Sequence, residues 1–138
     1  MTDLAAQARE QKMRITLLPV AQSPHIARTF IRHGLLDLHM PDLVDDACLI
    51  ASELVGNAVK HVPDADTYEL TLSHNQGRPL IELWDPSPKP PMTVDLPDAE
   101  FGRGLHIISA LASMWNYYTL PTECPGGGKV VWALLCPS

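Results

Sequence analysis

The sequence has few of the features that would place it outside the ordinary globular proteins. It has only three cysteines in 138 residues, Cys48, Cys124 and Cys136, an odd number without C-x-x-C spacing. This pattern favours reduced thiols in a cytosolic protein over a disulfide framework or a thiolate metal site. No apolar run approaches the roughly 20 residues of a membrane span, and the N-terminus lacks the apolar stretch of a signal peptide. We therefore expect a cytoplasmic protein that does not enter the membrane.

Basic charge is also scarce. Ten Lys and Arg stand against 16 Asp and Glu, which gives a formal net charge of −6. Nonspecific binding to nucleic acids or anionic membranes needs a basic surface, so neither is expected as a partner. An anion could be held only in a local pocket that is built for it.

What the sequence does contain is a normal globular composition, 46% hydrophobic and 19% charged, in a length that suits one domain. We assign residues 13–138 to this domain and residues 1–12 to a flexible or helical N-terminal tail. Periodicity predicts helices at 23–39, 41–62 and 101–115, and strands within 13–20 and at 67–74, 78–85, 115–120 and 129–135. Ser23 is the expected cap of the first helix, with Pro24 in its first turn.

Antiparallel hairpins that alternate with helices predict an α+β fold. We expect a two-layer sandwich with helices packed on one face of a mixed, mostly antiparallel sheet. The segment 86–97 holds five prolines and forms neither a helix nor a central strand. A loop of this length is often a functional lid.

The second helix carries an unusual polar stripe. At about 100° per residue, Glu53, Asn57 and Lys60 fall within about 60° of arc, opposite the apolar residues. A solvated helix face would explain this stripe, but Asn57 is a poor helix former, and Gly56 costs about 1 kcal/mol relative to Ala. Gly56 would be useful if another group approaches the helix closely. Chemically, an amide ligand for Mg²⁺, a carboxylate base and a cation on one face suit a nucleoside triphosphate with its metal.

Two further stretches contain candidate binding residues. Asp85 ends a strand whose Ile81 and Leu83 face the core, so its carboxylate needs a donor partner. It accepts either from the amine of a bound base or from the turn that Pro86 begins. The glycines of FGRGLHII, with Arg103 between them, suit either an anion at the helix N-terminus or simple helix initiation.

Taken together, these motifs carry a resemblance. The order E-L-V-x-N-A-x-K-H, W-D-P-S-P, G-R-G-L and G-G-K-V-V-W-A-L resembles the histidine-kinase-like (GHKL) ATPase superfamily, and within it the bacterial anti-sigma-factor serine/threonine kinases. The resemblance covers about residues 23–135. It implies ATP and Mg²⁺ as cofactors and Glu53 as the catalytic base. It also implies a set of cofactor-binding residues: Asn57 (also the metal ligand), Lys60, His61, Asp85, Ser87, Gly102, Arg103, Gly104, Leu105 and Lys129.

The implied function is regulatory. Such a protein binds a sigma factor or a similar partner and phosphorylates an antagonist protein on Ser or Thr, and a homodimer is compatible with this role. The alternative is a nucleotide-sensing binding module without phosphotransfer activity. Ser87 stands where the superfamily has a glycine, and the short proline-rich lid lacks the second glycine motif of sensor kinases. No helix with a phosphoacceptor histidine is expected, which argues against histidine autophosphorylation.

Overall fold

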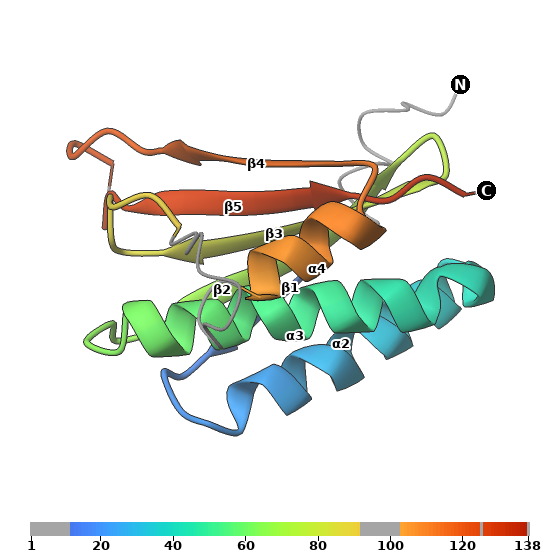
Figure 1. Cartoon of the computed structure of the whole chain (residues 1–138), viewed down its shortest axis with the longest axis horizontal. Helices are drawn as coiled ribbons and strands as arrows, with labels where there is room; N and C mark the ends of the chain where they lie inside the picture. Colours follow the sequence, from blue (N-terminus) through green and yellow to red (C-terminus); the bar gives the residue numbers. More distant parts are fainter. Residues whose placement is uncertain (1–11, 92–102, 125, 138) are drawn as a thin grey trace.

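The computed structural model describes residues 12–91, 103–124 and 126–137. Its elements in chain order are β1 (Met13–Leu17), α2 (Ser23–Asp37), a 3₁₀ turn (Pro41–Leu43), α3 (Val44–His61), β2 (Tyr68–Asn75), β3 (Arg78–Asp85), α4 (Arg103–Leu111), β4 (Met114–Thr119) and β5 (Lys129–Leu134). Figure 1 shows their arrangement. The order of helices and strands is the one predicted from the sequence.

The five strands form one sheet in the order β1-β2-β3-β5-β4, and every neighbouring pair is antiparallel. Gln76 and Gly77 close the β2–β3 hairpin with φ values of 54° and 77°, which match the twist of the flanking strands. The last strand, β5, lies between β3 and β4. The start of β5 therefore lies beside the end of β3, where Lys129 is paired with Asp85.

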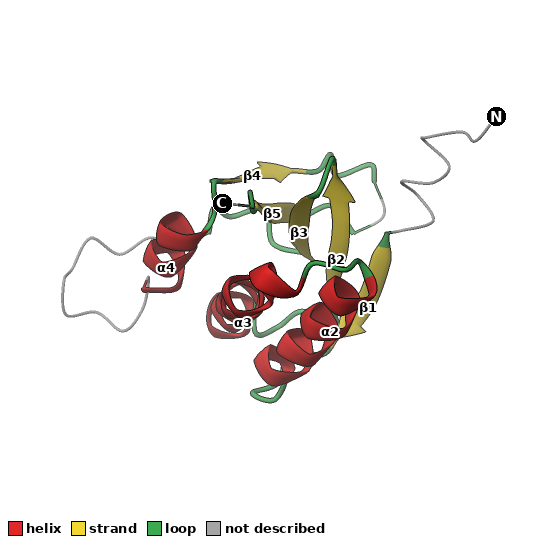
Figure 2. Ribbon diagram, turned by 90° about the vertical axis from the view of Figure 1, so that its right-hand side faces the viewer, coloured by secondary structure: helices red, strands yellow, loops and turns green. Residues whose placement is uncertain are grey.

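The helices cover one face of this sheet (Figures 1 and 2). Alternate residues of β2 and β3 are buried against them, among them Leu70, Leu72, Ile81 and Leu83. The strands alternate because successive side chains point to opposite faces of a sheet. The predicted two-layer α+β sandwich is confirmed, and its sheet is antiparallel throughout the described strands rather than mixed.

Two local expectations were wrong. Ser23 does not cap α2: the N-cap is Gln22 without a side-chain cap, and the buried hydroxyl of Ser23 donates to the carbonyl of Leu18. The third helix ends at Leu111 rather than at 115, since the backbone N–H of Ser113 already bonds the carbonyl of Leu134 in β5.

Gly56 does not mark a close approach within the part of the chain that the structure describes. A methyl group there would have only Pro24 Cγ within reach, at 4.0 Å, which is an ordinary contact. Pro24 is in the first turn of α2, so the neighbour at this position is the adjacent helix.

Candidate functional site

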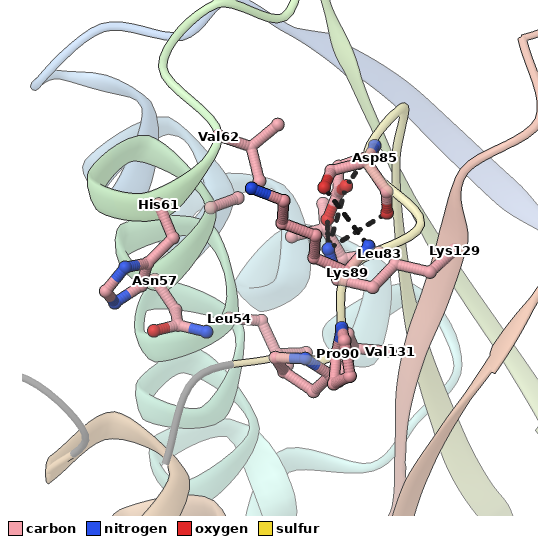
Figure 3. A pocket seen from close by; sticks show the side chains of 13 residues that line it. Leu54, Asn57, His61, Val62, Leu83, Asp85, Lys89, Pro90, Lys129 and Val131 are labelled. Carbon is pink, nitrogen blue, oxygen red and sulfur yellow. Dashed lines mark hydrogen bonds and ion pairs between the residues drawn. The ribbon is translucent and has the colours of Figure 1, made fainter. Parts of the chain in front are cut away.

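A cavity of about 190 Å³ lies between α3 and the ends of β3 and β5 (Figure 3). Its walls mix apolar and polar side chains. The apolar ones are Leu54, Ala58, Val62, Leu83, Val131, Pro90 and Pro91, and the polar ones are Asn57, His61, Asp85, Ser87, Lys89 and Lys129. Figure 3 shows Asn57 and His61 on α3, across the cavity from Asp85 and Lys129. Five of the residues singled out from the sequence therefore meet in one cavity.

The floor of the cavity is an ion pair. Lys129 Nζ lies 3.0 Å from each carboxylate oxygen of Asp85, and the two side chains are only 4% and 3% exposed. The pairing follows from the sheet, because these residues are opposite each other in the β3–β5 register. A buried charge without such a partner would be strongly unfavourable.

The turn after β3 also uses Asp85. The backbone N–H of Ser87 donates to Asp85 Oδ1 at 2.8 Å, and Lys129 Nζ donates to the Ser87 carbonyl at 3.2 Å. The turn-capping role of Asp85, one of the two alternatives raised by the sequence, is thus present. It uses Oδ1, which also accepts from Lys129 Nζ, whereas Oδ2 lies 3.0 Å from the same ammonium.

A glycine loop sets the position of Lys129. Gly126, Gly127 and Gly128 all have positive φ, and the carbonyl of Gly127 accepts from Trp84 Nε1 at 2.9 Å. A side chain on Gly128 would collide with the carbonyl oxygen of Asp85 and with Pro86. The glycine therefore allows the loop to pass directly over the end of β3 and to deliver Lys129 to the cavity.

Only some of the polar residues of α3 contribute to the cavity. Asn57 and His61 line it, whereas Glu53 and Lys60 are absent from the lining that the described residues form. Burial lowers the pKa of His61 from its ordinary 6.5, and the charges of Lys60 and Lys129 lower it further. The C-terminal end of α3 is fixed by Tyr68, whose hydroxyl lies 2.7 Å from the carbonyl oxygen of Val62 and 3.1 Å from that of Ala58 and shares its one proton between them.

The structure describes only part of the predicted binding stretch from Gly102 to Leu105. Gly102 lies outside the described residues, as does the part of the proline-rich segment 86–97 that begins at Met92. Arg103 and Gly104 are the first residues of α4, and Leu105 is buried in the core. Leu105 is thus positioned to anchor the start of α4 to the domain.

Sequence reasoning missed Lys89, Pro90 and Pro91, which line the cavity from the start of the proline-rich segment. A lysine among prolines directly after a candidate binding strand was the available signal. It also missed the partner of Asp85, which only the β3–β5 pairing provides.

Metal ligands are sparse. Within residues 12–91, 103–124 and 126–137, no three His, Cys, Asp or Glu side chains are grouped to hold an ion. The three cysteines are free, with Cys48 buried and the other two exposed. Asn57 is therefore the candidate ligand at the cavity, and Mg²⁺ would take its other ligands from phosphates and water. None of the described helices combines the length and apolar character that a membrane span requires.

No family model and no curated protein matches the sequence. Among solved structures, the chain is similar to the crystal structure of the RsbU and RsbW domains of Rv1364c from Mycobacterium tuberculosis, with a TM-score of 0.60 and 20% identity. The similarity covers 92% of this chain and 33% of that one, so the chain spans about a third of its neighbour's length. At this identity the comparison establishes the shared fold.

Proposed function

We propose that this chain binds ATP with Mg²⁺ in the cavity between α3 and β3–β5, and that it is an anti-sigma-factor-like serine/threonine kinase. Its partners would be a sigma factor or similar protein and an antagonist protein that it phosphorylates. The observation that carries the proposal is the buried Asp85 carboxylate in a cavity with apolar side chains in its walls, across from Asn57 on α3. The motif resemblance and the fold shared with a structure that contains an RsbW domain support it.

The cavity suits a planar base. An apolar cavity of about 150 Å³ can hold a benzene ring, and this one is about 190 Å³. Leu54, Leu83 and Val131 supply apolar walls, and Asp85 supplies a buried acceptor for an exocyclic amine. The carboxylate is held in place by Ser87 and Lys129, so little ordering would be needed on binding.

The residues of α3 would act further along the nucleotide. Asn57 offers an amide oxygen to the metal, whose chemistry when bound is to neutralise charge on the transferring phosphoryl group. Glu53 lies one helical turn before Asn57 on the same stripe. In the kinase proposal, Glu53 takes the proton of the attacking Ser or Thr hydroxyl.

One observation favours the second candidate, a nucleotide-sensing module without transfer. Glu53 is half-buried on α3 and does not contribute to the described lining of the cavity. A protein that only senses nucleotide would need Asp85 and Asn57 for binding, but it would not need Glu53 as a catalytic base. The two candidates share the binding site and differ in chemistry.

Calorimetry of the full chain with ATP, with and without Mg²⁺, tests the shared part. We expect Mg²⁺-dependent binding that Asn57→Ala weakens, whereas Asn116→Ala, on exposed β4, leaves it unchanged. Absence of ATP binding at millimolar concentration would overturn the proposal. A partner captured from the host and incubated with γ-labelled ATP then separates the candidates: label on the partner supports the kinase, and binding without transfer supports the sensing module.

A further inference from the structure

The two oxygens of Asp85 are used unequally. Oδ1 accepts from the backbone N–H of Ser87 at 2.8 Å and from Lys129 Nζ at 3.0 Å. An ionised carboxylate oxygen has about two acceptor positions, so both positions of Oδ1 are filled. Oδ2 lies 3.0 Å from the same ammonium and keeps a position for one further donor.

The three donors of the Lys129 ammonium are also used unequally. An ammonium has three donors, and Lys129 directs two hydrogen bonds at Asp85 Oδ1 and the Ser87 carbonyl within the described chain. Lys129 lines the cavity and is only 4% exposed, so bulk water has little access to its third proton. The cavity floor therefore offers one acceptor and one donor, 3.0 Å apart.

We propose that Lys129 is a specificity-determining residue that donates to a ring nitrogen of the bound base, while Asp85 Oδ2 accepts from the adjacent amino group. This inference rests on the proposed nucleotide binding, and it identifies the edge of the base that forms hydrogen bonds with the site. A 6-aminopurine carries an amino donor beside an unprotonated ring nitrogen, which matches this pair. The lysine, rather than the carboxylate alone, would then set the choice of base.

The same count disfavours guanine. Its edge presents one oxygen acceptor followed by two donors, a ring N–H and an amino group. Lys129 can serve the oxygen and Oδ2 can accept from one donor, but Oδ1 is already saturated by Ser87 and Lys129. The second donor would be buried without a partner. Such a loss corresponds to roughly a tenfold to hundredfold weaker affinity.

The test is a titration of the full chain with ATP, GTP and 1-deaza-ATP, in which the ring nitrogen beside the amino group is replaced by C–H. For the wild type we expect ATP to bind about tenfold or more tightly than either analogue. In Lys129→Met, ATP and 1-deaza-ATP should bind equally, because the donor that distinguishes them is gone. The matched control is Lys89→Met, a lysine that lines the same cavity and is exposed. This change should alter all three affinities by one common factor.

The double variant Asp85→Val/Lys129→Met covers the case in which Lys129→Met does not fold. It leaves no buried charge unpaired, and it too should bind ATP and 1-deaza-ATP equally. Equal wild-type affinities for ATP and 1-deaza-ATP would overturn the inference while leaving nucleotide binding intact. Persistence of the preference in the Lys129 variants would also overturn it. If no nucleotide binds the wild type, the proposed function falls and the inference with it.

Discussion

Two carboxylates of the candidate site lie in opposite environments. Asp85, at the end of β3, is 2% exposed, paired with Lys129 and bonded to the turn at Ser87. Glu53, in the middle of α3, is half-buried on the polar stripe and outside the described cavity lining. Any role of Asp85 in binding is therefore inseparable from its role in the fold. Glu53 can be changed without disturbing the core.

The largest effect should fall on chemistry at Glu53, if the kinase proposal is correct. Glu53→Gln removes the base, so phosphoryl transfer to the partner should fall by roughly 10²–10⁴-fold. The free energy of unfolding should stay within about 0.5 kcal/mol of wild type, as for surface changes in general. Labelled ATP measures the transfer, and Glu123→Gln, an exposed loop residue, is the matched control. Loss of ATP binding by a folded Glu53→Gln protein would contradict the separation of the two carboxylates.

The next effect should fall on stability at the ion pair. Lys129→Met leaves the Asp85 charge buried without its partner, and we expect a loss of about 3–5 kcal/mol in the free energy of unfolding. Asp85→Val/Lys129→Met removes both charges and should recover most of that loss. Urea unfolding of the two proteins and the wild type measures the difference. Near-equal stability of Lys129→Met and Glu53→Gln would remove the contrast between the two regions.

A smaller effect is expected at the loop that positions Lys129. Gly128 has φ +84°, and a Cβ there would collide with the backbone of Asp85 and Pro86, whereas Gly77 has φ +77° and a Cβ there would meet open space. Gly77→Ala should cost about 1–2 kcal/mol for the left-handed backbone. Gly128→Ala should cost a further 1–3 kcal/mol or so from the collision. Equal losses in denaturant unfolding would show that the loop can move away from β3.

The smallest effect concerns pH and His61. Burial, then Lys60 and Lys129, lower the pKa of His61 below its ordinary 6.5. The unfolded chain therefore binds this proton at higher pH than the folded protein does. The free energy of unfolding keeps its full value above pH 6.5, and it decreases as the pH falls from about 6.5 towards the lowered pKa of His61.

His61→Gln should reduce this slope, and the difference between the two unfolding profiles isolates the histidine from other titrating groups. His33→Gln, on the exposed side of α2, is the matched histidine control for the substitution. A steeper slope in His61→Gln than in the wild type would contradict the sign of the shift.

Much of the fold could be read from the sequence because its signals are local. Alternation at 78–85 buries Ile81 and Leu83 on one face, and the Gln76-Gly77 turn fixes the hairpin. The helical period of 44–61 separates the apolar face of α3 from the stripe that holds Asn57. The motif order also identified five residues that line the cavity, although their roles remain predictions.

Only the tertiary structure decided which partner each polar group has. Asp85 and Lys129 are 44 residues apart, and they meet because β5 inserts beside β3 in one particular register. The hydroxyl of Ser23 turned back to Leu18, and Glu53 lies outside the cavity lining that includes Asn57 one turn away. The periodicity of apolar residues indicates which face of an element is buried, because residues at a fixed spacing along the chain share one face. The choice of partner across a sheet depends instead on long-range packing and strand order, which no local spacing contains.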